Sequence, residues 1–194
     1  DTSDPNNRFT NCNSISSITF GSNIEYILSF TFHPDIKKSG SSSLNFIGSK
    51  ISSVTLGSGI KSIGERAFSH RSNIDIINMS PATNLEEISE YAFYGTGIRS
   101  FSIPQSVITL GEGLLADCKS LNTLTIPSNA NIESIPDYCC YRDTSLTYII
   151  INSSYSGINI GEFAFYGCSN LQNLNFITNA TSKVKKIGKG AFIR

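Results

Sequence analysis

The residues that could carry acid–base chemistry are few. The chain of 194 residues contains two histidines, His33 and His70. No neighbouring motif supplies either imidazole with the orienting partner that a general base or an activated nucleophile needs. We therefore predict a protein that is not an enzyme and that needs no cofactor.

Thiol chemistry is equally limited. Five cysteines in 194 residues are too sparse and too odd in number for a disulfide scaffold, and no Cys-x-x-Cys spacing suggests a metal site. Cys139 and Cys140 are adjacent, and a vicinal disulfide would strain the backbone. The sequence therefore favours free thiols, of which at least one points into a core.

Hydroxyl and amide side chains make up most of the polar residues. The chain carries 15 basic and 15 acidic residues, so its net charge is zero, and charged residues are 15% of the total, against about 25% in an ordinary domain. A neutral surface has no field that would attract nucleic acid or an anionic membrane. We expect neither as a partner.

An internal repeat determines where these polar side chains lie. Within each copy, apolar residues occupy positions one, four and six, as in Ile51, Val54 and Leu56. The spacing of two between positions four and six predicts a β-strand. The copies begin at Ile15, Ile51, Ile74, Ile98, Leu121, Leu146 and Leu171, at intervals of 23 to 25 residues after a first interval of 36.

A second apolar motif follows each predicted strand. An Ile precedes an Ala-Phe pair by four residues, as Ile63 precedes Ala67 and Phe68. Apolar residues at this spacing predict one short helical turn with its ring inward. Stacked copies would then form a parallel sheet and an internal ladder of Phe rings.

Two stretches resemble a known repeat family. They are Ile-Pro-x-Ser-Val-x-x-Leu-Gly at 103–111 and Ala-Phe-Tyr-Gly-Cys-Ser-Asn-Leu at 164–171. Both resemble the BspA-like, or Treponema-type, leucine-rich repeat, and the resemblance extends from Phe9 to Phe192. It implies a right-handed leucine-rich-repeat solenoid with a parallel β-sheet on one face and short helical turns and loops on the other. The pattern departs from the family where Leu114-Leu115 and Cys139-Cys140 replace Ala-Phe.

The repeats predict a single domain over residues 1–194. It would hold about seven repeats of 23–27 residues, with an insertion near 35–49 that we expect to form a loop. Neither end shows the polar cap that terminal repeats usually carry. We therefore expect a fragment of a longer protein, with any membrane anchor outside it.

The resemblance also carries an expected role. The family is known from surface proteins of mucosal bacteria and of protozoan parasites such as trichomonads, where it is implicated in adhesion. It implies a cell-surface or secreted protein that recognises a protein or glycan ligand on a host or microbial surface. The same fold also serves intracellular scaffolds for protein–protein interaction, and this alternative stays open.

The candidate binding residues lie at the outward strand positions two, three and five. These positions carry short hydroxyls and amides around an apolar pair, Tyr148 and Ile150, that could anchor a ligand or another copy of the chain. A solvated Ser- and Thr-rich strand surface would have the same composition. The candidate set is Tyr148, Ile150, Thr125, Thr123, Ser102, Arg99, Asn78 and Ile76.

Overall fold

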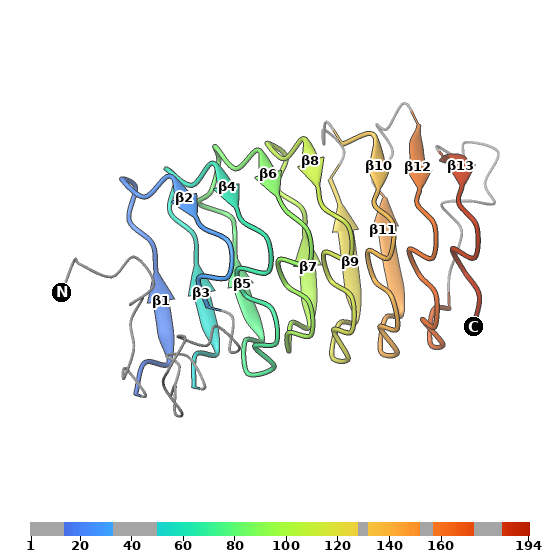
Figure 1. Ribbon diagram of the computed structural model, residues 1–194, viewed down its shortest axis with the longest axis horizontal. Helices are drawn as coiled ribbons and strands as arrows, with labels where there is room; N and C mark the ends of the chain where they lie inside the picture. Colours follow the sequence, from blue (N-terminus) through green and yellow to red (C-terminus); the bar gives the residue numbers. More distant parts are fainter. Residues whose placement is uncertain (1–13, 33–49, 128–131, 152–156, 173–183) are drawn as a thin grey trace, which may run out of the picture.

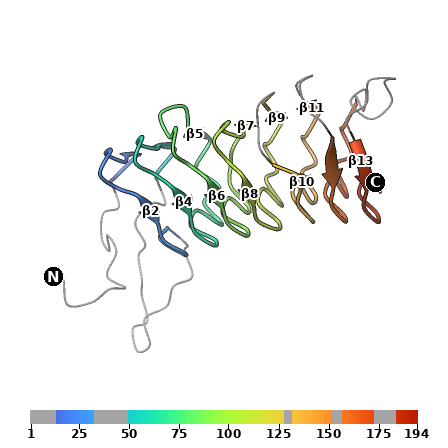
Figure 2. The same ribbon diagram turned by 90° about the horizontal axis from the view of Figure 1, so that it is seen from above.

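The computed structural model describes residues 14–32, 50–127, 132–151, 157–172 and 184–194. Within these ranges the chain winds through successive coils, and their strands form two rows (Figures 1 and 2). The first strand row contains β1 (Ser17–Thr19), β3 (Ser53–Thr55), β5 (Ile76–Asn78), β7 (Ser100–Ser102), β9 (Thr123–Ile126) and β11 (Tyr148–Ile151). The second strand row contains β2 (Tyr26–Ile27), β4 (Ser62–Ile63), β6 (Glu87–Ile88), β8 (Thr109–Leu110), β10 (Ser134–Ile135), β12 (Ile158–Ile160) and β13 (Val184–Ile187).

Strand pairing follows the sequence repeat. Every pairing among the described strands is parallel, and equivalent positions of successive copies meet except at Ile158, where the register between β12 and β13 shifts. Val54 of β3, for example, lies between Ile18 of β1 and Ile77 of β5. The predicted parallel β-solenoid is thus confirmed.

The interior of the coils holds the three predicted apolar positions. Ile51, Val54 and Leu56 are all buried, as are the equivalent residues Ile98, Phe101 and Ile103. Full burial of such a side chain stabilises the fold by about 1.5–3 kcal/mol. One coil cannot enclose these residues alone, so the core exists only through stacking.

The predicted ladder of Phe rings is present. The rings of Phe32 and Phe68 stack with centroids 5.0 Å apart, and those of Phe68 and Phe93 stack at 5.4 Å. Leu115 and Cys140 continue the ladder as buried residues where the sequence lacks Phe. The chain therefore keeps an inward apolar side chain at this position in every described copy.

The predicted helical turns are wrong, since the described residues contain no helix. The segment around Phe68 instead forms two consecutive tight turns, in which the Ala67 N–H donates to the Gly64 carbonyl and the Ser69 N–H to the Arg66 carbonyl, each at 3.2 Å. Arg66 adopts a φ of 49°, which no right-handed helix allows.

Hydrogen bonds between coils explain this conformation. The N–H groups of Arg66, Phe68 and His70 donate to the next coil at 3.0, 2.8 and 2.7 Å. A helix would direct these donors along its own axis. In this segment the N–H groups of alternating residues point to the neighbouring coil instead, so hydrogen bonds between stacked coils replace those of a helix.

Each strand row is interrupted once in the described residues. The first row divides between β5 and β7, and the second between β8 and β10. The second break has a cause in the sequence: Gly111 and Gly161 donate their N–H groups to the preceding coil at 2.7 and 2.9 Å, whereas the equivalent Pro136 has no N–H.

Two expectations lie outside the described residues, namely the loop at 35–49 and the position of His33. The described ranges contain no helix long and apolar enough for a membrane crossing.

Candidate ligand-binding face

The outward side chains of the first strand row form continuous columns, because the strands pair in register. Position three of the repeat places Ser100, Thr123 and Tyr148 next to one another on β7, β9 and β11. Position five likewise places Ser102, Thr125 and Ile150 next to one another on the same three strands.

The apolar pair on β11 is exposed, as the sequence predicts. The Tyr148 side chain is 48% exposed and Ile150 is 44% exposed, whereas Leu146 and Ile149 are buried. The two exposed apolar groups lie side by side on one strand, next to the hydroxyls of Thr123 and Thr125 on β9. They are available for contact with a partner.

The structure brings together five of the eight candidate residues. Tyr148, Ile150, Thr123, Thr125 and Ser102 share the sheet formed by β7, β9 and β11. Arg99 immediately precedes β7 and is exposed. The remaining two, Ile76 and Asn78, are exposed on β5, which belongs to the other sheet of the first row.

A short polar chain lies beside Tyr148 at the beginning of these strands. The Thr123 hydroxyl donates to the Asn122 side-chain oxygen at 3.0 Å, and the Asn122 amide donates to the Thr147 hydroxyl at 3.1 Å. Asn122 and Thr147 occupy outward positions of the repeat but stand outside the predicted candidate set. Their hydrogen bonds fix the polar side chains next to the exposed ring.

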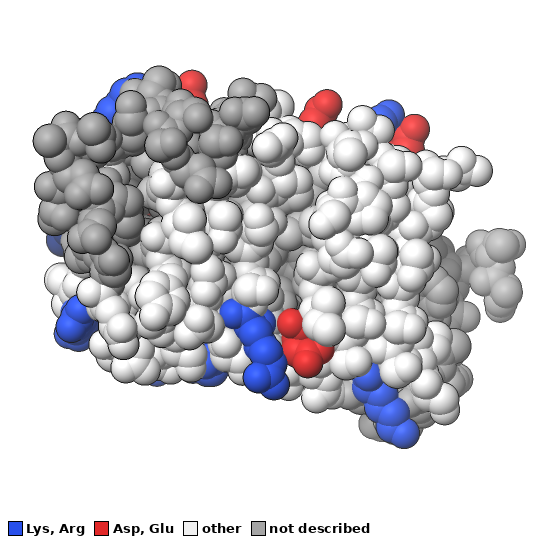
Figure 3. All heavy atoms as spheres, turned by 180° about the vertical axis from the view of Figure 1, so that it is seen from behind, with Lys and Arg blue, Asp and Glu red and all other residues white. Residues whose placement is uncertain are grey.

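Few charges interrupt this surface. Figure 3 shows the molecule from behind the view of Figure 1, and Figure 2 places the first row on that side. This face has a broad uncharged area, with charged side chains near its margins. Recognition here would therefore rely on hydrogen bonds and apolar contact rather than on ion pairs.

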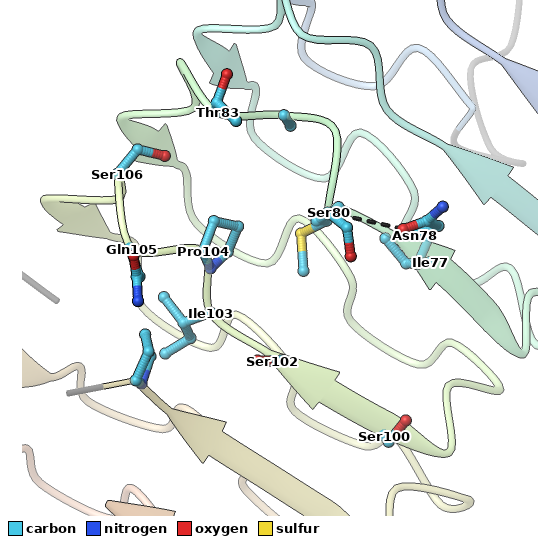
Figure 4. A pocket seen from close by; sticks show the side chains of 13 residues that line it. Ile77, Asn78, Ser80, Thr83, Ser100, Ser102, Ile103, Pro104, Gln105 and Ser106 are labelled. Atoms are coloured by element: carbon cyan, nitrogen blue, oxygen red, sulfur yellow. Dashed lines mark hydrogen bonds between the residues drawn. The ribbon is translucent and has the colours of Figure 1, made fainter. Parts of the chain in front are cut away.

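A groove of about 590 Å³ opens where the first row divides between β5 and β7 (Figure 4). Its walls come from β5, from the loop after it, and from β7 with the loop that follows. The lining residues are Ile77, Asn78, Met79, Ser80, Ala82, Thr83, Ser100, Ser102, Ile103, Pro104, Gln105, Ser106 and Pro127. Asn78 and Ser102 were candidates from the sequence, and the loop residues were not.

Unequal loop lengths could have indicated this groove. The segment from Met79 to Ile88 has two more residues than the equivalent segments Leu56–Ile63 and Ile103–Leu110. The longer loop folds back through a hydrogen bond from the Ala82 N–H to the Met79 carbonyl at 2.9 Å. A short loop beside a long one leaves a hollow.

A second recess of about 560 Å³ lies over β10, β12 and β13 and carries charges of both signs. The Asp137 carboxylate there accepts the Glu162 N–H at 2.6 Å. This carboxylate therefore supports the turn of the next coil.

The thiols and one carboxyl group lie inside the coils. Cys118, Cys139, Cys140 and Cys168 are buried free thiols, with Sγ atoms of the adjacent pair 3.9 Å apart. Asp143 is buried among them, and burial raises the pKa of its carboxyl group well above the ordinary value. None of these groups can reach a ligand on the surface.

His70 lies in the turn that follows β4. It is an exposed turn residue with a φ of 59°, and its ring meets the edge of Tyr94 at 4.9 Å. It stands at the turn position that Gly95 and Gly167 occupy in other coils, where φ is also positive. Among the described residues, no three His, Cys, Asp or Glu side chains gather as a metal site would require.

Several solved structures of bacterial proteins share this architecture. The leucine-rich repeat protein of Treponema pallidum superposes with a TM-score of 0.57 at 17% identity, covering 88% of this chain and 85% of that one. A leucine-rich repeat protein of Eubacterium ventriosum superposes at 0.63 with 21% identity, covering 93% and 59%. A leucine rich cell surface protein of Faecalibacterium prausnitzii superposes at 0.57 with 18% identity, covering 82% and 47%.

At sequence identities of 17–21%, these superpositions show a shared fold and nothing beyond it. The chain spans less than two thirds of the Eubacterium and Faecalibacterium proteins. No relative among curated protein sequences matches the chain.

The family profile described as BspA type Leucine rich repeat region matches in six copies, over residues 2–38, 41–159 and 133–194. The matched residues cover nearly the whole chain, and they include the strands, the Phe ladder and the tight turns described above. The chain belongs to the BspA type leucine-rich-repeat family.

Proposed function

We propose that this chain is the ligand-binding module of a cell-surface or secreted adhesion protein. Its first strand row recognises a protein or glycan on a host or microbial surface. The observation that carries the proposal is the exposure of Tyr148 and Ile150 on an uncharged sheet of hydroxyl side chains.

The chemistry of the pair supports this role. A Tyr ring offers a large contact area with few rotamers to immobilise, and its hydroxyl can still donate or accept a hydrogen bond. Thr123 and Thr125 pair directly with Tyr148 and Ile150 and supply hydroxyls around them. An apolar centre with a polar rim is the usual anatomy of a binding surface.

Location at the cell surface is supported by family membership and by the Faecalibacterium relative, which is itself a cell surface protein. In that location the module would meet partners outside the cell.

Attachment of protein-coated beads to cultured mucosal epithelial cells tests the proposal. The double variant Tyr148→Ser with Ile150→Thr should lower the attachment constant by about tenfold or more, because it removes the apolar centre. Its melting temperature should stay close to that of the unmodified protein, since both side chains are exposed.

The chain offers a matched control. Tyr26 and Leu28 are 55% and 56% exposed in the second strand row, so Tyr26→Ser with Leu28→Thr removes the same chemistry elsewhere. The control should attach normally. Equal attachment by both variants, or attachment no better than that of albumin-coated beads, would show that the proposal is wrong.

A further inference from the structure

The division between β5 and β7 leaves two strand edges facing each other across the groove. On either side of it, the Leu56 N–H donates to the Asn78 carbonyl at 2.9 Å and the Ile103 N–H donates to the Thr125 carbonyl at 3.0 Å. The repeat predicts the same bond from Met79 to Ser102, and no such bond joins these two described residues. Both lie in the wall of the groove.

The same omission occurs at the beginning of the strands. The Ile76 N–H donates to the Ser52 carbonyl at 3.2 Å, and the Tyr148 N–H donates to the Asn122 carbonyl at 3.1 Å. The equivalent donor, the Ser100 N–H, makes no such bond to the preceding coil in the described residues, and β5 and β7 belong to different sheets.

The coils stay joined elsewhere, so the opening is confined to one side. In the second row, β6 pairs with β8. In the turns, the Tyr91 and Phe93 N–H groups donate to the next coil at 2.8 and 3.0 Å. The Ser106 hydroxyl donates to the Leu85 carbonyl at 2.6 Å and holds the short loop beside the long one. The groove is thus a preformed feature of the fold.

The composition of the groove restricts what could occupy it. None of its lining residues is charged and none is aromatic. The absence of charge disfavours phosphorylated or ionic ligands, and the absence of an aromatic platform disfavours a sugar ring. Unpaired strand edges, in contrast, are the groups that recognise extended peptides by strand addition.

We propose that this groove binds an extended, uncharged peptide segment as an added strand between β5 and β7. The segment accepts from the Met79 and Ser100 N–H groups and donates to the Ser102 carbonyl. The hydroxyl side chains of Ser80, on the loop after β5, and of Ser102, on β7, line the groove (Figure 4). The volume of about 590 Å³ lies within the range of roughly 300–1,000 Å³ that is typical of ligand pockets. This site is separate from the Tyr148 and Ile150 surface.

A blocked hexapeptide that copies the strand segment at 121–126, Leu-Asn-Thr-Leu-Thr-Ile, is a suitable probe because it is uncharged and alternates as a strand does. We expect saturable binding at up to about 1 mM peptide. Binding should slow hydrogen exchange at the Met79 and Ser100 amides. A peptide N-methylated at alternate residues should bind about tenfold more weakly, because it loses pairing along one edge.

Two variants locate the peptide. Ser102→Trp fills the groove from an exposed position and should abolish binding, whereas Ser52→Trp places the same ring on an exposed first-row position outside the groove and should leave binding unchanged. The Tyr148→Ser, Ile150→Thr variant should also bind the peptide normally.

Three results would overturn the proposal. The first is no peptide binding at about 1 mM. The second is binding that survives Ser102→Trp, which would place the peptide at a terminal coil. The third is slowed hydrogen exchange in the groove with neutral oligosaccharides and not with the peptide.

Discussion

Polar side chains at one buried position of the repeat differ in how fully they are hydrogen-bonded. Thr96, Cys118, Asp143 and Cys168 occupy the same position of successive copies. The Thr96 hydroxyl and the Cys118 thiol both donate to the Phe93 carbonyl, at 2.9 and 3.1 Å. Asp143 accepts the Cys118 N–H at 2.7 Å through Oδ1, but its Oδ2 is buried without a hydrogen-bond partner among the described residues.

The buried carboxyl group of Asp143 predicts a pH-dependent stability. Burial raises its pKa well above the ordinary value of 3.8 in the folded protein, so the folded chain binds a proton that the unfolded chain has released. The free energy of unfolding should therefore fall as pH rises above about 4, by up to roughly 1.4 kcal/mol per pH unit, until the folded pKa is reached. The nearby thiols remain neutral in this range, because burial raises the pKa of Cys118 and Cys168 above 9.0.

Urea unfolding between pH 4 and 8 measures this effect. Asp143→Asn should remove about one bound proton from the pH dependence of the free energy of unfolding. An unchanged slope in Asp143→Asn would mean that Asp143 is ionised in the folded protein.

The Phe ladder gives a second prediction at this scale. Phe93→Ala or Phe165→Ala should lower the free energy of unfolding by about 3–5 kcal/mol, because each buried ring fills a slot between neighbouring coils. Denaturant melts compare these variants with Ile108→Ala, whose side chain is exposed. Similar losses in all three would contradict the ladder.

The tight turns determine the spacing of the coils at the scale of elements. Residues with positive φ recur at one position of the turn, including Arg66, Tyr91, Gly113 and Tyr138. The Tyr91 ring covers the backbone of Gly113 in the next coil, and its hydroxyl donates to Glu112 at 2.6 Å. At Gly113 the Tyr91 ring therefore occupies the space that a Cβ would need.

Gly113→Ala should consequently destabilise the protein by about 1–3 kcal/mol, since a Cβ would both strain the φ of 61° and overlap the Tyr91 ring. Gly21→Ala is the control, because no atom lies within 4 Å of its added Cβ. In a Tyr91→Ala background the loss at Gly113 should shrink to the backbone contribution. Equal losses in both backgrounds would rule out the ring contact.

The sequence predicted some elements better than others for a physical reason. The strands and the Phe ladder were predictable because their side chains alternate or recur inward, as Val54 and Phe68 do. The turns were not, because the spacing of Ile63, Ala67 and Phe68 suits a helix as well as two tight turns. Only the hydrogen bonds to the next coil decide between these conformations.

The candidate site was likewise predictable only in part. Exposure of Tyr148 and Ile150 followed from strand alternation. The groove could not be predicted in the same way, because a difference in loop length creates a hollow only when the long and the short loop stack on each other. The separation of Ile76 and Asn78 from the other candidates follows from that break.

The whole molecule is a one-dimensional stack in which each coil contacts only its neighbours. Such a stack presents a long surface whose composition can vary without disturbing the core. Here the first row carries an uncharged face, with a groove at one point and an exposed apolar pair at another. We propose that the protein meets its partner on this face, at Tyr148.

Hydroxyl-radical footprinting of the protein bound to cultured mucosal epithelial cells tests that claim most directly, because Tyr148 and Tyr26 report on the two strand rows within one sample. The free protein should be oxidised at both residues, which are 48% and 55% exposed. In the bound protein, oxidation of Tyr148 should fall severalfold while that of Tyr26 stays unchanged. Protection of Tyr26 with Tyr148 still fully oxidised would place the contact on the second strand row and not at Tyr148.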